Sequence, residues 1–548
     1  MGIPALLHRG ELVTDNKEKA SVLNDQYKQQ FTKERLADLP KENDSGIQPM
    51  KEIVVSEEGV IKLLAGLSPF KAMGPDEISP WVLKTTAHEI GPALTIIFQH
   101  SLDTGIVPQD WLCANITPIY KKGARTDPAN YRSVNLTSVS SKIMEHILHS
   151  NIMNHLDTHN ILCHQQHGFR KAHSCETRLL STTQDIALEL DQKQQTDIII
   201  MDFSKALDKV PHQRLLLKLW RYGIRGKTLK WITSFLTQRK QRVVLDGETS
   251  EWVYVQSSVP QGTVTGPLYF LLYINDLPDG LCSNVRLFAD DCILYNTVSG
   301  PNDAAKLQRD LDTLTEWQNR WQMDFNASKC YVLRVTHATK NIHKFSYTLN
   351  NTILQETQTH TYLGVDISHD FKWNSHINRI AAKANKTLGF IKRNLYSCSQ
   401  QIKCMSYKTT QVHPVLDFCS SVWDPRTKSA LIQIRAARFV NRVYSRESSI
   451  TAIKKDFWET LQIRRKFDRL TNFHQAVAGH LAVPYKPPAP GREGLTTNFS
   501  QHKFHTHPSQ QRLLQILIYS TDIERLGRSP RHCNQHKKQE SFHDSSKP

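Results

Sequence analysis

The sequence lacks any hydrophobic run long enough to cross a membrane. Its longest strongly apolar stretch, from Gly266 to Leu277, falls well short of the about 20 residues that a spanning helix needs. The amino terminus has no signal-peptide core, and Leu6 stands where a myristoylation signal requires Ser or Thr. These absences argue against secretion and membrane anchoring, and they predict an intracellular protein of the nucleus or the cytoplasm.

Paired cysteines are absent as well. The ten cysteines form no CxxC pair, which argues against a zinc ribbon or a disulfide scaffold and fits a reducing compartment. Residue types that bind metals do gather near the carboxyl end: His502, His505, His507, Cys533 and His536. A metal site and a His-rich disordered tail are both open interpretations of this segment, and we favour the tail.

Acidic residues are scarce relative to basic ones. The 69 Lys and Arg outnumber the 52 Asp and Glu, which gives a formal net charge of +17. Such an excess favours a polyanionic partner, nucleic acid first and an anionic membrane second, although a generally basic protein also fits the charge alone. With 548 residues, the chain is expected to contain several subdomains.

The order of the predicted elements indicates an α+β fold. The apolar run from Asp197 to Asp202 is typical of a buried central strand that ends in an acid. Apolar runs at Val285–Leu287 and Ile293–Tyr295 flank the pair Asp290-Asp291 and predict a tight hairpin with the carboxylates at its tip. Helices are predicted over 212–222, 227–237, 266–277 and 303–323, and a further strand over 331–335. This order suits an antiparallel sheet with helices on one face.

Three acids, Asp202, Asp290 and Asp291, come at the ends of these predicted strands. Carboxylates that face one another repel, and a hard divalent cation would neutralise them. Two strands ending in carboxylates could hold a pair of such ions, which is the arrangement that drives phosphoryl transfer. The alternatives are a solvated turn for the acidic pair and a helix cap or loop acid for Asp202.

A series of segments, in order along the chain, closely resembles the polymerase motifs of reverse transcriptases from non-LTR retrotransposons, the jockey-like and LINE-like elements. These segments are KAMGPDEI (71–78), ITPIYKKG (116–123), DPANYRSVNL (127–136), QHGFRKAHSC (166–175), DFSKALDKVPH (202–212), SSVPQGTVTGPLYFLLYINDLP (257–278), LFADDCILY (287–295), WQMDFNASKC (321–330), YLGVDIS (362–368) and SSVWDP (420–425). Any one of them could arise by chance, but the ordered set could not plausibly do so.

The resemblance implies a right-hand polymerase with fingers, a palm built on an antiparallel sheet, and a helical thumb. It divides the chain into a helical lead-in (1–50), an N-terminal fingers extension (51–110), fingers and palm (111–345, within a domain of about 100–367), a helical thumb (370–480) and a disordered basic tail (484–548). The implied reaction is primer-dependent DNA synthesis from dNTPs on an RNA template.

The resemblance also assigns the metal site. Asp202 and Asp290 match the principal Mg²⁺ ligands, Asp291 matches the supporting acid, and the backbone carbonyl of Phe203 is expected to complete the shell of one ion. Two Mg²⁺ ions are implied, with Mn²⁺ as a possible substitute.

Further positions match residues that meet the incoming nucleotide. Lys121, Lys122 and Arg132 fall where cations of the fingers meet the triphosphate, and Arg offers bidentate pairing. A solvated basic turn is the alternative for the two lysines. Gln261 and Gly262 resemble the PQG segment beside nucleotide and template, where Gly permits a close backbone approach.

The segment 321–330 adds one residue of catalytic interest. Lys329 matches a lysine that protonates the leaving pyrophosphate, and a surface lysine is the equal alternative. Trp317 and Trp321 stand one helical turn apart, and we expect them to pack in the core rather than to stack on bases.

Two positions depart from the family pattern. Leu207 stands where the family usually has Phe, the expected steric gate against a ribose 2′-hydroxyl, so selection against ribonucleotides is predicted to be relaxed. Thr265 stands where Leu is usual. An unpartnered hydroxyl in this packed junction would cost about 1–2 kcal/mol, so reduced stability is predicted.

The ends of the chain differ from full-length elements as well. The resemblance begins almost at Met1, so we expect no endonuclease and a primer 3′ end supplied elsewhere. A catalytically silent remnant that only binds RNA or RNA–DNA duplex is therefore the alternative to an active enzyme. A group II intron maturase or retron-type polymerase would keep the same chemistry.

Overall fold

The computed structural model describes residues 2–41, 46–410, 412–423, 435–436, 439–440 and 461–483. The chain divides into two compact units, Met1–His376 and Ile377–Pro548. The predicted tail over 484–548, with its His and Cys residues, lies outside the described residues. Among the residues that are described, no helix is long and apolar enough to span a membrane.

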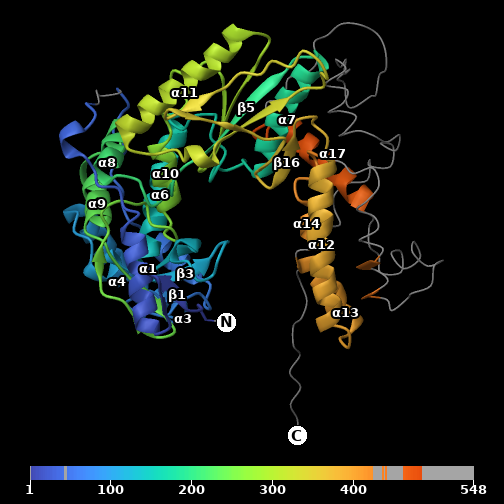
Figure 1. Ribbon diagram of the computed structural model, residues 1–548. Helices are drawn as coiled ribbons and strands as arrows, with labels where there is room; N and C mark the ends of the chain where they lie inside the picture. The colour runs from blue at the N-terminus through green and yellow to red at the C-terminus, as the bar shows by residue number, and fades with distance from the viewer. Residues whose placement is uncertain are drawn as a thin grey trace. The chain divides into compact units, whose positions relative to one another are not determined.

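A five-stranded sheet with the order β14-β11-β5-β10-β9 forms the palm of the first unit. Its central strand β5 and the nearby helix α11 (Pro301–Trp321) are labelled in Figure 1. Its strands are β5 (Thr196–Asp202), β9 (Asn284–Phe288), β10 (Asp291–Thr297), β11 (Tyr331–Val335) and β14 (Gln355–Glu356). Neighbouring strands are antiparallel except β11 and β14, which are parallel. The predicted central strand, the acidic hairpin and the strand over 331–335 are thus confirmed.

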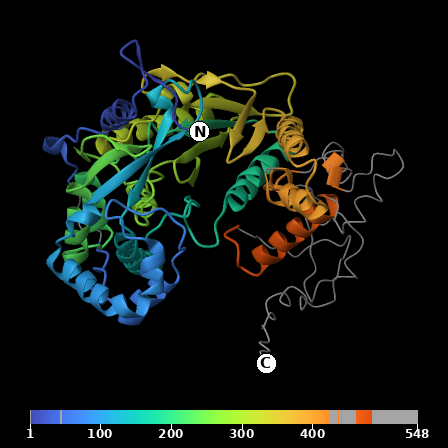
Figure 2. The same ribbon diagram turned by 90° about the horizontal axis from the view of Figure 1, so that it is seen from below.

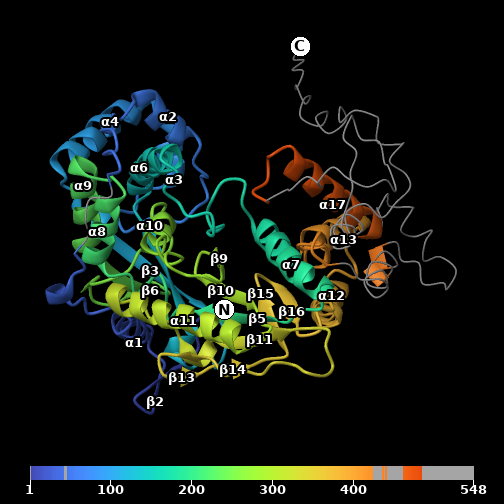
Figure 3. The same ribbon diagram turned by 90° about the horizontal axis from the view of Figure 1, so that it is seen from above.

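Successive side chains of β5 point to opposite faces of this sheet, and both faces are buried. Ile199 and Met201 enter the main hydrophobic core, which they share with α10 (Gly266–Tyr273) and α11 (Pro301–Trp321). Figure 3 shows α11 lying across β5 and β10. On the other face, α7 (Cys175–Asp191) approaches β9, where Asp185 accepts a hydrogen bond from Arg286 at 2.7 Å.

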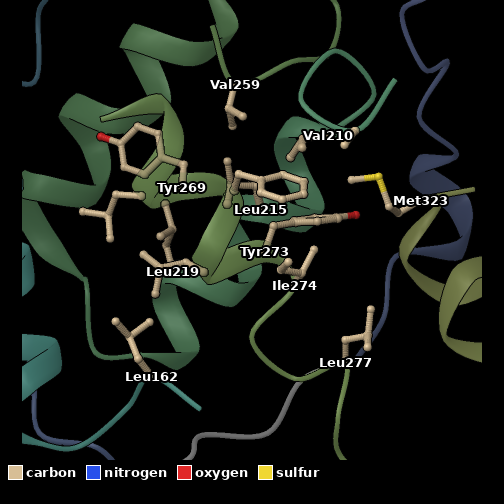
Figure 4. Packing of buried hydrophobic residues seen from close by; sticks show 14 of the residues in the cluster. Leu162, Val210, Leu215, Leu219, Val259, Tyr269, Tyr273, Ile274, Leu277 and Met323 are labelled. Carbon is tan, nitrogen blue, oxygen red and sulfur yellow. The ribbon is translucent and has the colours of Figure 1, made fainter. Parts of the chain in front are cut away.

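The core around α10 is dense and mainly aliphatic and aromatic. Figure 4 shows Tyr269 and Tyr273 of α10 among Leu215, Leu219 and other side chains of α8 (His212–Arg221) and its flanking loops. Such close packing of large apolar groups is the main source of folding free energy. Trp321 is buried in this core and Trp317 packs against it, which confirms that both tryptophans are structural.

The predicted helices over 212–222, 227–237 and 303–323 are present as α8, α9 (Gly226–Thr237) and α11. The helix predicted over 266–277 ends earlier, at Tyr273. Lys218 Nζ hydrogen-bonds the Tyr273 carbonyl at this end. Asn275 then donates its side-chain amide to the Ile161 carbonyl at 2.8 Å and so ties the chain outside the helix.

A second sheet, with the order β4-β3-β6-β7 and β8 paired to β6, forms the fingers. Its strands are β3 (Cys113–Tyr120), β4 (Tyr131–Thr137), β6 (Lys240–Leu245), β7 (Glu248–Thr249) and β8 (Val253–Tyr254). One face packs on α1 (Asn16–Lys28), where Ile116 and Val243 meet Ala20 and Leu23.

The remaining elements of the first unit surround these two sheets. Helices α2 (Glu57–Ala65), α3 (Pro80–Thr85) and α4 (Ala87–Thr104), blue in Figure 2, lie together beside α6 (Val139–Thr158) and α9. Short elements complete the unit: β1 (Leu6–His8), β2 (Glu11–Val13), α5 (Gln109–Leu112), β12 (Thr348–Leu349), β13 (Thr352–Ile353), β15 (Thr359–Tyr362), β16 (Val365–Ser368) and the 3₁₀ turns Leu36–Asp38, Pro128–Asn130 and Ala327–Lys329.

The described part of the second unit is helical. Helix α12 (Asn374–Asn394) leads into it from the first unit, and α13 (Gln400–Thr409), α14 (His413–Asp417) and α17 (Leu461–Val477) follow. Arg465 of α17 donates to the Leu416 carbonyl of α14 at 2.8 Å and lies over the buried Trp423 ring. The helical content agrees with the predicted thumb.

Candidate active site

The three acids singled out in the sequence lie together where strands β5 and β10 of the palm sheet meet at their ends. Asp202 ends β5, and Asp291, the first residue of β10, is its register partner. Asp290 occupies the turn between β9 and β10 with Ala289, whose φ of 53° is left-handed. The turn is thus tight enough to bring a third carboxylate beside the first two.

The backbone pattern brings the Asp202 and Asp291 side chains close. The Asp202 carbonyl accepts from Asn326 N at 2.7 Å, on the side away from β10. Asp202 and Asp291 are therefore a non-hydrogen-bonded antiparallel pair, the kind whose side chains approach most closely. Like charges are held together at this position by the fold itself.

The electrostatic consequence is visible at Asp291. Its side chain reaches solvent, yet crowding by surrounding protein atoms, followed by the charges of Asp290 and Asp202, raises the pKa of Asp291 to about 6. The carboxylate is destabilised because bulk water does not fully solvate it and because its neighbours repel it. A cation at this site would relieve both effects.

Basic groups face the carboxylates. Lys329 Nζ lies 3.2 Å from Asp202 Oδ2, and both side chains are about half exposed, at 56% and 43%. Partial burial, then the positive charges of Arg132 and Lys329, lower the pKa of Lys121, while Asp202 opposes this shift. The structure therefore brings Lys121, Arg132 and Lys329 into the electrostatic neighbourhood of the acids.

The strands of the fingers explain how these cations are positioned. Arg132 of β4 is the register partner of Ile119 in β3. One step further, Lys121 N donates to the Asn130 carbonyl at 2.9 Å, which extends the ladder to the turn. Lys122 follows Lys121 in this turn, and both are exposed.

The Phe203 carbonyl is directed by an isolated antiparallel bridge between Phe203 and Phe325. The hydrogen bonds of this bridge come from the flanking residues of the segments 202–204 and 324–326. In such a pair the central residues turn their own backbone groups away from each other. The Phe203 carbonyl therefore points away from Phe325, toward the side of β5 that carries β10.

The PQG segment packs directly on β4. Gly262 has φ +106°, and a Cβ there would lie 2.6 Å from the Asn135 carbonyl oxygen. Asn135 in turn donates its backbone N–H, at 2.8 Å, and its side-chain amide, at 2.9 Å, to the Gln261 carbonyl. Gly262 therefore makes a close backbone approach to strand β4, while its predicted approach to nucleotide and template stays a prediction.

Leu207 lies beside this segment. Its side chain is partly buried against the main core, and its carbonyl accepts from Val259 N at 2.9 Å. The next residue, Asp208, receives a hydrogen bond from Gln261 Nε2 at 3.4 Å, and burial raises the pKa of Asp208 to about 6. The sequence drew no attention to Asp208, since one acid in a motif carries no separate signal.

The expectation for Thr265 is wrong, because its hydroxyl has a partner. Thr265 is fully buried, and its Oγ1 donates to Glu145 Oε2 at 2.9 Å. The same oxygen accepts the backbone N–H groups of Val264, at 2.9 Å, and Thr265, at 3.0 Å. Glu145 of α6 thus anchors the loop after PQG through its Oε2 atom, and this oxygen gives the Thr265 hydroxyl the partner that the expected cost assumed to be missing.

Two residues of QHGFRKAHSC support the acidic turn, a role that the sequence did not reveal. Gln166 is buried, and its Oε1 accepts from Ala289 N at 2.9 Å and from Gly168 N at 2.7 Å. A Cβ on Gly168 would lie 2.4 Å from Ala289 N. The sequence motif drew attention to this segment but not to its role, because the contact joins residues more than a hundred positions apart in the chain.

The carboxylate trio fits a metal that takes few protein ligands. Within the described residues, no group of three or more His, Cys, Asp or Glu side chains is arranged so that it could hold a metal ion on its own, and this includes Asp202, Asp290 and Asp291. Mg²⁺ does not need one, since it is bound through one or two carboxylates and completes its shell with water and substrate phosphates. Burial, followed by the charges of Asp290 and Asp202, raises the pKa of Asp291, and a bound cation would lower it.

Known proteins resemble this chain in sequence. Residues 119–367 match the family described as reverse transcriptase (RNA-dependent DNA polymerase). The chain is 27% identical over 447 residues to the RNA-directed DNA polymerase from mobile element jockey of Drosophila melanogaster, which covers 78% of this chain and 48% of that protein. It is 24% identical over 534 residues to the probable RNA-directed DNA polymerase from transposon BS of the same organism, covering 88% and 57%.

The chain thus spans about half the length of the curated relatives it matches. Among solved structures, apo telomerase from Candida tropicalis truncated from its C-terminal domain is similar over 51% of this chain and 59% of that chain, at 14% identity. The TM-score of 0.33 is too low to carry an argument.

Proposed function

We propose that this chain, whose residues 119–367 form a reverse transcriptase domain, is an RNA-directed DNA polymerase of a jockey-like non-LTR retrotransposon. Its substrates are an RNA template, a DNA primer and dNTPs, and its location is the nucleus or the cytoplasm. The cross-strand pairing of Asp202 with Asp291, with Asp290 in the adjoining turn, supports this proposal most directly. A solvated surface turn has no need of three acids held together.

The acids and one backbone carbonyl serve as metal ligands in this proposal. Polymerases use divalent metal ions to stabilise the attacking and leaving oxygens of the displacement. When bound, two Mg²⁺ ions, or Mn²⁺ in their place, would activate the primer 3′-hydroxyl and neutralise charge on the departing pyrophosphate. Asp202 and Asp290 are the principal ligands, Asp291 supports them, and the Phe203 carbonyl supplies a neutral oxygen.

The basic residues bind and orient the triphosphate. Lys121, Lys122 and Arg132 lie on the β3–β4 hairpin of the fingers, and cations there offset the negative charge that the nucleotide brings to three carboxylates. Lys329, which lies beside Asp202, donates a proton to the leaving pyrophosphate. Gln261 and Gly262 hold the nucleotide against β4 through the Asn135 contacts.

Primer extension on poly(rA)/oligo(dT) with Mg²⁺ tests the proposal. The parent protein should add dTMP to the primer, and Asp290→Ala should abolish addition. Asp324→Asn is the matched control, because it removes a nearby exposed carboxylate that pairs with Lys209 and not with the strand ends. An exposed pair of this kind contributes little to stability, so this variant should retain extension.

The alternative is a remnant that binds RNA or RNA–DNA duplex without extending a primer. It predicts duplex binding by the parent protein together with no extension at any divalent-ion concentration. Equal extension by the parent and by Asp290→Ala would contradict both functions and would point to a contaminating polymerase.

A further inference from the structure

Two aromatic rings at the edge of the fingers sheet each hold a cation over one face. Arg242 Cζ lies 4.6 Å from the centroid of the Trp252 ring, and Lys240 Nζ lies 4.8 Å from that of Tyr254. Lys240 and Tyr254 are register partners of β6 and β8, so the two pairs are neighbouring rungs. These four residues are called the cation–ring ladder below.

The ladder lies on the same face of the sheet as Arg132. Arg242 Nε donates to Oδ1 of its register partner Asn115 at 2.9 Å. Asn115 and Ile119 are four residues apart on β3, and Ile119 pairs with Arg132. Alternation along a strand therefore places all of them on one face, with about 13 Å of strand between Asn115 and Ile119 at about 3.3 Å per residue.

This face is open to solvent, in contrast to the face that packs on α1. Trp252 is 38% exposed and Tyr254 is 62% exposed, although both belong to types that usually bury their rings. Ile119 is 51% exposed, and Arg132 is exposed beside it. The face thus combines accessible rings, accessible apolar surface and positive charge, and it leads to the nucleotide-binding residues.

We propose that the cation–ring ladder binds the unpaired RNA template as it approaches the active site. This inference rests on the proposed function, which supplies the occupant. Exposed rings stack on bases of any sequence, and lysine and arginine beside them neutralise the phosphates. A duplex would not use the rings, because its base faces are already stacked on one another. Rungs two residues apart are spaced by about 6.6 Å, which suits successive splayed nucleotides.

Binding of two RNA–DNA duplexes, one blunt and one with a 5′ template overhang of about eight unpaired nucleotides, tests this proposal. Fluorescence anisotropy in EDTA, without dNTPs, separates binding from catalysis. The parent protein should bind the overhang duplex more tightly than the blunt one. W252A/Y254A should weaken binding of the overhang duplex by about thirtyfold or more and leave the blunt duplex unchanged.

Matched variants separate stacking from general damage. W252F/Y254F keeps two aromatic faces and should retain the overhang preference, whereas W252L/Y254L keeps apolar bulk without them and should lose it. Lys240→Gln with Arg242→Gln should reduce the salt dependence of overhang binding. Circular dichroism of each variant checks that the fold is kept.

The ladder proposal is overturned if the parent shows no overhang preference, if the leucine pair keeps it, or if both duplexes weaken equally. Capture of a protein rather than RNA on this face would also appear as an unchanged overhang preference. Failure of the polymerase proposal looks different: the parent would bind the overhang through the ladder but would not extend a primer.

Discussion

Asp202 and Asp291 face each other as a non-hydrogen-bonded pair across β5 and β10, with Asp290 one residue away in the turn. The fold therefore concentrates negative charge at the ends of two neighbouring strands. Other groups must neutralise that charge. Lys329 forms an ion pair with Asp202 and so neutralises part of this charge. Burial, followed by the charges of Asp290 and Asp202, raises the pKa of Asp291 to about 6.

Divalent-ion binding should become stronger as the pH rises toward 6 and level off above it. The pKa of Asp291 is about 6 in the folded metal-free protein, so a proton competes with the ion below that value. At pH 5 this competition should weaken binding about tenfold relative to pH 7, as follows from a single titrating group with that pKa. Mn²⁺ binding followed by electron paramagnetic resonance measures the effect.

The raised pKa of Asp291 also determines how the stability of the protein without bound metal changes with pH. Because the folded pKa of Asp291 is raised, the folded state binds more protons than the unfolded state between about pH 4 and pH 6. This contribution to stability is present at low pH and is lost as the pH rises through 6. Asp291→Asn should remove both pH effects; an unchanged pH profile of Mn²⁺ binding in that variant would assign the titration to another group.

Leu207→Phe should increase discrimination against ribonucleotides. Leu207 lies beside the PQG segment, its carbonyl accepts from Val259 N, and its side chain is partly buried. In the proposed polymerase it holds the position of the steric gate, with a side chain shorter than Phe. A ring at this position would restrict the space for a ribose 2′-hydroxyl. Steady-state extension with dTTP and with UTP measures the ratio of kcat/KM values for the two.

The ratio of kcat/KM for dTTP to kcat/KM for UTP should be smaller in the parent protein than in Leu207→Phe. Leu207→Met serves as the control. Methionine keeps a flexible side chain of similar volume and should leave the ratio near that of the parent. Equal ratios for the parent and for Leu207→Phe would show that the gate lies elsewhere.

The carboxylates and the palm strands could be predicted from the sequence because their signals are local. The apolar run over 197–202 and the apolar flanks of Asp290-Asp291 specify strands without reference to the rest of the chain. The end of α10 could not be predicted, because Asn275 is held by the carbonyl of Ile161, far away in the sequence.

The role of Thr265 shows the same limit. Judged alone, a threonine in a packed junction looks costly, and only the fold shows that Glu145 of α6 accepts its hydroxyl. Gln166 and Gly168 also act through the distant Ala289. Local sequence patterns predict where helices and strands form. They do not predict which of these elements pack against one another.

Thr265→Val should destabilise the protein by about 1–3 kcal/mol, because it deletes one hydrogen bond to a buried carboxylate and keeps the side-chain shape. Thr265→Ser keeps the hydroxyl and should cost less. Chemical denaturation followed by tryptophan fluorescence compares the two. A valine variant at least as stable as the parent would show that Glu145 does not depend on this hydroxyl.

Gly168→Ala should reduce extension while it leaves the folded protein intact. The added methyl group would lie 2.4 Å from Ala289 N, so the turn that carries Asp290 must shift by some tenths of an ångström or more. Misplacement of a catalytic group on that scale is expected to lower kcat by about ten- to a hundredfold. Single-turnover extension at saturating dNTP isolates this step from nucleotide binding.

Gly300→Ala is the matched control for this change. A Cβ at Gly300 meets nothing within 4 Å, and its φ of −175° is extended backbone that alanine adopts freely. It should therefore keep the kcat of the parent. Gln166→Leu should resemble Gly168→Ala, because it removes the oxygen that holds Ala289 N and Gly168 N together. Full activity in both variants at the turn would show that the position of Asp290 is set by β9 and β10 alone.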